Sequence, residues 1–233
     1  MVVEQPPAGE PKKEKDPDIG PRLQILATEH WSLLATRSLT YTESFSRVTM
    51  FFSVLSGAVI ALALVAQAGR FGSAFFAAAI LVLAVVFFVG VATIARLMAV
   101  NLDDLRWVAG MNRLRHAYLE LHPELERYFV TAWHDDARGI SLTMGLEGLP
   151  HRSPLANVAH GFQTLPGMLS VVVGVVGGAL AALVALALGA PQAIAVTAGV
   201  VAFVLTIAGI GVFGWRSISG YTKSLTPRFP TPG

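Results

Sequence analysis

The residues best suited to chemistry are histidines that gather in one segment of the sequence. Five of the six, His116, His122, His134, His151 and His160, lie there, and two aspartates follow His134 directly. Imidazole with carboxylate can hold a borderline divalent metal, or act as a general base oriented by its carboxylate. The spacing matches no metal signature, and no nucleophile stands beside the group in a recognisable context. We therefore predict neither an enzyme nor a cofactor, and a metal on the histidine-rich segment stays an open alternative.

The composition places the chain among membrane proteins. Hydrophobic residues make up 54% and charged residues 14%, against about 25% charged in soluble domains. The absence of cysteine excludes disulfides and thiolate chemistry. A formal net charge of +2 is small for a nucleic-acid binder, so we expect none as a partner.

Long segments without charge predict an all-α protein with four transmembrane helices. Twenty-two residues separate Arg47 from Arg70, 25 separate Arg70 from Arg96, and the 63 residues of 153–215 contain no charged side chain. About 20 apolar residues span the hydrocarbon core. The last segment is long enough for two spans, with a break at 189–192. We predict spans at 48–68, 74–95, 165–188 and 193–215, arranged as two hairpins.

The positive charges predict the orientation. Sixteen of the 17 lysines and arginines fall in the N-terminal tail, the central loop and the C-terminus, and Arg70 alone falls on the other side. Because cytoplasmic loops retain positive charge, both termini and the central loop are expected in the cytoplasm. Arginine over lysine and the abundance of alanine, valine and glycine favour the cell inner membrane of a bacterium, with the lipid bilayer as first partner.

These features give a predicted organisation along the chain. It comprises a disordered tail (1–20), a cytoplasmic helix (21–47), transmembrane hairpin 1 (48–95), a cytoplasmic helix and loop (96–164), transmembrane hairpin 2 (165–215) and a cytoplasmic tail (216–233). Within the loop, the spacing predicts a helix over 124–133 and irregular chain over 135–164.

Helical periodicity continues from the first hairpin into the cytoplasm. Apolar positions recur at three and four residue steps before the first span and after the second, until Pro123 stops the pattern. The two seams, interrupted only by Ser38 and Asp104, are Trp31, Leu34, Ser38, Tyr41, Phe45 and Val48, and then Leu97, Val100, Asp104, Trp107, Met111, Leu114, Tyr118 and Leu121. We predict that these seams meet in an antiparallel helical stalk, a coiled-coil-like extension. Arg37 and Asp104 would lie at one height and form an ion pair.

Small residues recur at helical spacing within the spans. Ser53, Gly57 and Ala61 repeat every four positions in the first span, Gly174 and Gly178 form a GxxxG in the third, and Gly199 lies in the fourth. Such stripes allow helix backbones to approach closely in lipid. Two interpretations stay open: packing within one chain, or a contact between subunits.

Two functions fit these patterns. The leading one is a non-enzymatic scaffold or interaction protein that forms a homo-oligomer and binds a cytoplasmic protein partner through the stalk. The alternative is an oligomeric ion channel or pore-forming effector gated by the cytoplasmic helices. The layout of residues 22–122, a cytoplasmic helix, a hairpin and a second helix, resembles the pore-forming SLATT modules of bacterial defence systems, although the second hairpin departs from that pattern. The resemblance implies a pore.

Overall fold

The computed structural model describes residues 18–69, 72–145 and 161–232, and these residues contain helices and no strand. Four helices are long: α1 (Ile19–Gly69), α2 (Ser73–Leu121), α5 (Leu165–Ala187) and α6 (Gln192–Ser224). Each contains a window long and apolar enough to cross a membrane, which confirms the predicted all-helical class with four candidate spans. The predicted disordered tail falls largely outside the described residues, as does Arg70.

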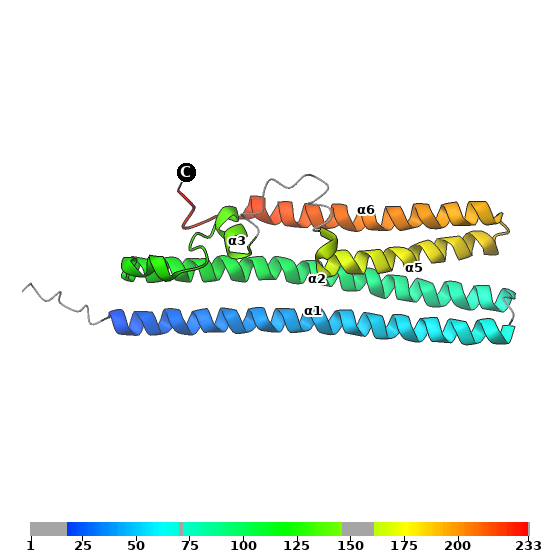
Figure 1. The fold of residues 1–233 in the computed structure, drawn as a ribbon, viewed down its shortest axis with the longest axis horizontal. Coiled ribbons are helices and arrows are strands. Elements are labelled where there is room, and N and C mark those ends of the chain that lie inside the picture. The colour runs from blue at the N-terminus through cyan, green and yellow to red at the C-terminus, as the bar shows by residue number, and fades with distance from the viewer. Residues whose placement is uncertain (1–17, 70–71, 146–160, 233) are drawn as a thin grey trace, which may run out of the picture.

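The four helices form layers around α2 (Figure 1). Helix α1 packs along one side of α2 in the opposite chain direction, while α5 and α6 lie on the other side. The end of α1, the start of α2, the end of α5 and the start of α6 lie at one end of the molecule, and the polar parts of α1 and α2 extend at the other. Helix α2 is therefore the central element.

The apolar core runs through α2 at a glycine. A Cβ atom on Gly90 would lie 2.5 Å from Cγ2 of Val173 and 2.9 Å from Cε2 of Phe51. Phe51 of α1 and Val173 of α5 are both fully buried. Because Gly90 has no side chain, Phe51 and Val173 pack closely against the backbone of α2 from either side.

Local signals set the ends of α5. The hydroxyl of Thr164 accepts a hydrogen bond from the amide of Gly167 at 3.2 Å, and Pro166 occupies the first turn, where no amide donor is needed. At the other end Gly189 adopts φ 81°, a left-handed conformation that glycine takes without strain. The chain then turns directly into α6.

Three details differ from the predicted organisation. The predicted helix over 124–133 is only a 3-10 helix, η1 (Pro123–Tyr128), and Phe129 to Asp136 is not helical. Part of the segment predicted to be irregular forms α3 (Ala137–Thr143), because the Asp136 carboxylate caps it through the amide of Gly139 at 2.8 Å. Helix α6 continues through the start of the predicted tail to Ser224, since no proline follows Trp215 until Pro227.

Candidate functional site

The polar part of the α1 and α2 contact contains a buried ion pair. Nε of Arg37 donates to Oδ1 of Asp104 at 2.6 Å, and Nη2 donates to Oδ2 at 3.1 Å. The hydroxyl of Tyr41 donates to the same carboxylate at 3.4 Å. Asp104 is 6% exposed. The hydrogen bond from Arg37 to Asp104 raises the pKa of the guanidinium. The structure therefore brings together the two residues that the sequence suggested as partners.

A second ionic cluster lies nearer the apolar parts of the same helices. Glu43 accepts hydrogen bonds from Arg96 of α2 at 2.9 and 3.1 Å and from Arg47 of α1 at 2.8 Å. The bonds from Arg96 and then Arg47 lower the pKa of the Glu43 carboxyl to about 2. Because a bidentate guanidinium pair has fixed geometry, Glu43 and Arg96 set the register between α1 and α2.

The face of α1 that contacts α2 differs from the predicted seam. Leu33 lies against Gly110, and His30 stacks on Tyr118 with ring centroids 6.0 Å apart. The positions of α1 that are at least partly buried recur at three and four residue steps, and four of the following seven are polar. They are Leu23, Leu26, His30, Leu33, Arg37, Thr40 and the buried Ser44. The predicted seam was wrong for α1, because the polar contacts to α2 select this face.

The more apolar stripe of α1 consequently faces outward. Trp31 is 71% exposed and Phe45 is 59% exposed, and Leu34 and Tyr41 are exposed as well. Only Val48, at the beginning of the predicted span, is partly buried. We call Trp31, Leu34 and Phe45 the outer stripe; Tyr41 borders it, because its ring is exposed while its hydroxyl reaches Asp104. An apolar group of this kind on a surface usually marks an interaction site.

The small residues of the spans divide into two groups. Gly178 and Gly199 pack α5 on α6: a Cβ atom on Gly178 would lie 2.8 Å from the carbonyl oxygen of Gly199. Gly174 lies against Phe203 of α6 in the same contact. Ser53, Gly57 and Ala61 are exposed, and nothing lies within 4 Å of a Cβ on Gly57. The glycines of α5 and α6 therefore pack within the chain. Ser53, Gly57 and Ala61 instead lie exposed on the apolar part of α1.

The C-terminal segment docks on the end of α2, which the sequence did not suggest. The Asp135 carboxylate is fully buried and accepts hydrogen bonds from Nε of Arg113 at 2.6 Å and from the backbone amides of Arg228 and Phe229 at 3.0 and 2.8 Å. The ring of Phe229 stacks on His116 with centroids 4.0 Å apart. The feature of the sequence that could have indicated this contact is an aromatic residue, Phe229, close to Pro227 and Pro230 in an otherwise polar tail.

The two aspartates beside His134 thus hold the tail. Burial alone would raise the pKa of Asp135, but the amide of Arg228, the side chain of Arg113 and the amide of Phe229 lower it below its ordinary value. Asp136 accepts from the amide and hydroxyl of Thr231 at 3.1 and 3.0 Å. Its pKa is also lowered, because the bonds from Gly139 and Thr231 outweigh its burial.

The histidines do not assemble a metal centre within residues 18–69, 72–145 and 161–232, where no group of three or more histidines and carboxylates could hold an ion. His116 and His134 lie with ring centroids 6.2 Å apart, and the Nδ1 atom of each is buried with no hydrogen-bond partner in the part of the chain that the structure describes. His151 and His160 lie outside the described residues. Of the described histidines in this segment, His116 packs against Phe229 of the tail, whereas His122 contacts Glu124.

The four helices are long and apolar enough to cross a membrane, and this length and composition are those of a multi-pass α-helical membrane protein. Comparison with protein-family models, with curated proteins and with solved structures finds no match.

Proposed function

We propose that this protein is a non-enzymatic, self-associating scaffold of a cell membrane, oriented with both termini in the cytoplasm. The two hairpins cross the bilayer. The polar parts of α1 and α2, residues 22–47 and 96–121, form the antiparallel stalk that presents a surface to cytoplasmic proteins. Copies of the chain meet along the outward side of α1.

The exposure of the outer stripe carries this proposal. Trp31 lies 17 positions before Val48, or about 25 Å along a helix from the start of the span. Lipid hydrocarbon covers apolar side chains inside the bilayer but does not reach that far. An exposed tryptophan, leucine and phenylalanine on one side of a helix in water therefore favour a protein partner.

The continuity of the outward side of α1 favours a second copy as that partner. Below the membrane edge it is aromatic and apolar, and beyond Val48 it includes the small residues Ser53, Gly57 and Ala61 beside larger exposed ones such as Ile60 and Leu64. A partner that covers both parts must run beside α1 in water and in lipid. The α1 helix of another copy has the required length, and small residues permit close approach of two such helices in the bilayer.

Single cysteines test this contact directly, because the chain contains none. Ser53→Cys should form disulfide-linked dimers when membranes are oxidised. The matched control is Gly209→Cys on α6, which is also exposed and lies seven positions from Arg216, as Ser53 lies six from Arg47. Equal crosslinking of both variants, or of neither, would reject α1 as the contact between copies.

The alternative function is a channel, and the hydroxyl groups on the outward side of α1 favour it. Thr49, Ser53 and Ser56 are exposed at one end of the span, and an oligomer in which they faced one another would enclose a polar path. Purified protein in liposomes separates the two functions. Sustained ion flux would support the channel and contradict a purely structural scaffold, whereas silence would favour the scaffold.

A further inference from the structure

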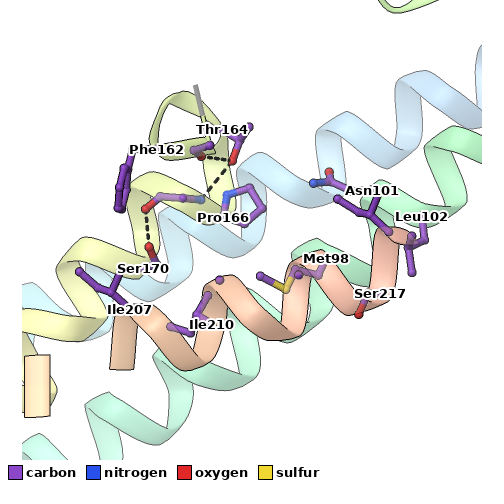
Figure 2. A pocket seen from close by; sticks show the side chains of 15 residues that line it. Met98, Asn101, Leu102, Phe162, Thr164, Pro166, Ser170, Ile207, Ile210 and Ser217 are labelled. Atoms are coloured by element: carbon purple, nitrogen blue, oxygen red, sulfur yellow. Dashed lines mark hydrogen bonds between the residues drawn. The ribbon is translucent and has the colours of Figure 1, made fainter. Parts of the chain in front are cut away.

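A cavity of about 520 Å³ lies between α2, the start of α5 and α6 (Figure 2). This volume falls in the range of small-molecule sites, about 300–1,000 Å³. Its walls come from three helices: Met98 and Asn101 from α2, the N-cap Thr164 and Ser170 from the beginning of α5, and Ile210 and Ser217 from α6. No charged side chain lines it among the described residues.

One end of the cavity is apolar. Ile207, Ile210 and Met98 line it, and Gly211 and Gly214 leave room beside them. A Cβ atom on Gly211 would have no neighbour within 4 Å, whereas one on Gly214 would lie 3.1 Å from Cε of Met98. The space therefore exists partly because α6 has glycine where most apolar helices have a larger residue.

The other end presents uncharged polar groups. The hydroxyls of Thr164 and Ser217 donate to the carbonyl oxygens of Gly161 and Phe213 at 2.8 and 2.9 Å, so they retain acceptor capacity. The side chain of Asn101 is exposed and has no hydrogen-bond partner among the described residues, so its carboxamide is accessible to an occupant. A carboxamide can donate two hydrogen bonds and accept others, which suits an ester or a hydroxyl group better than an ion.

The direction of the cavity matches the proposed membrane position. Asn101 lies five positions beyond Arg96 and Ser217 lies one beyond Arg216, so the polar end falls at the level of the lipid headgroups. Ile207 lies nine positions before Arg216, about 13 Å deeper along a straight helix. An occupant would need a polar, uncharged end at the interface and an apolar chain reaching into the bilayer.

We propose that the cavity binds one acyl chain of a membrane phospholipid, with the glycerol ester region at Asn101 and the chain along Ile207, Ile210 and Gly211. The site rests on the membrane position included in the proposed function, but it does not depend on self-association. If Ser53→Cys does not crosslink, the lipid site is unaffected. If the lipid site is absent, self-association through α1 is likewise unaffected.

Gly211→Leu is the central variant, because Gly211 lines the cavity and a Cβ atom there has no neighbour within 4 Å. Gly209→Leu is its matched control: it adds the same side chain two positions away on the same helix, where a Cβ also meets nothing, and Gly209 does not line the cavity. Displacing about two methylene groups of a bound chain lowers affinity about tenfold.

Native mass spectrometry in mild detergent with added phosphatidylethanolamine gives the readout. The wild-type chain and Gly209→Leu should each retain one phospholipid, and Gly211→Leu should require about tenfold more lipid for the same occupancy. Equal retention by all three chains, or equal loss in both variants, would overturn the proposal. Preference for a free fatty acid over the phospholipid would also contradict it.

A second measurement uses the wild-type chain, so its result does not depend on whether a variant folds. A phosphatidylethanolamine with a diazirine near the end of one acyl chain, added to the detergent-purified protein at an equimolar ratio, should label the peptide around Ile207 and Ile210 on irradiation. Asn101→Leu should reduce this labelling, because it removes the carboxamide that would bind the ester region at the polar end. Labelling spread evenly over the outward faces of α1 and α6 would contradict a specific site.

Discussion

Nε of Arg37 lies 2.6 Å from Oδ1 of Asp104, although 67 positions separate the two residues. The side chain of Asp104 is 9% exposed, so its carboxylate depends on Arg37 and Tyr41 for the interactions that water would otherwise provide. Such a pair aligns the two helices more than it stabilises them, because both ions lose hydration when they are buried.

Removal of one partner should therefore cost more than removal of both. We expect Arg37→Leu to lower the stability of the solubilised protein by about 3 kcal/mol, because a buried carboxylate is left unpaired. The double variant Arg37→Leu, Asp104→Leu should recover most of this loss. Thermal unfolding in detergent measures both, and a single variant as stable as the wild type would show that the pair has no structural role.

Acid should weaken the contact between α1 and α2 through Glu43. The pKa of its carboxyl is lowered from 4.5 to about 2 in the folded protein. A lowered folded-state pKa means that the stabilisation is complete above pH 4.5 and is lost as the pH falls from 4.5 toward 2. Unfolding midpoints across this range should fall more steeply for the wild type than for Glu43→Gln. Parallel curves would contradict the assignment.

The C-terminal segment should be released when Asp135 is replaced. Asp135→Ala removes the acceptor of three hydrogen bonds and leaves Arg113 without its partner, a loss of about 3 kcal/mol in docking. Trypsin should then cleave after Arg228 much faster, as followed by mass spectrometry. Asp103→Ala is the control, since its ion pair with Arg106 is exposed and worth about 0–1 kcal/mol. Equal cleavage of both variants would refute the docking role.

The two groups of small residues should respond in opposite directions to a single methyl group. Gly178→Ala forces a Cβ to within 2.8 Å of the Gly199 carbonyl oxygen and should destabilise the α5 and α6 contact by about 1–3 kcal/mol. Gly57→Ala meets nothing and should leave the monomer equally or slightly more stable, by up to about 1 kcal/mol of helix propensity. Thermal unfolding of monomers in detergent compares them. Losses of the same size would mean that Gly57 is also packed within the chain.

Most of the fold was accessible from periodicity and charge. The positions of the helices followed from charge-free segments and from Pro123, because these are local properties of the chain. The position of Arg37 opposite Asp104 followed from counting residues along the two helices from Arg47 and Arg96, which we place at the membrane edge. The docked tail could not be predicted, because no local pattern links Asp135 to the amides of Arg228 and Phe229, more than 90 positions away.

By itself, the sequence determined that the chain is helical, that four helices are apolar enough to cross a membrane, and where each lies within a few residues. Only the tertiary structure decided which side of α1 meets α2. Two stripes, one through Trp31 and one through Leu33, have the same helical spacing, and the more apolar of them is the one left exposed. The reason is physical: a helix is formed by its own backbone hydrogen bonds, but its orientation is set by the charges and shapes of its neighbours, here Asp104, Arg96 and Gly110.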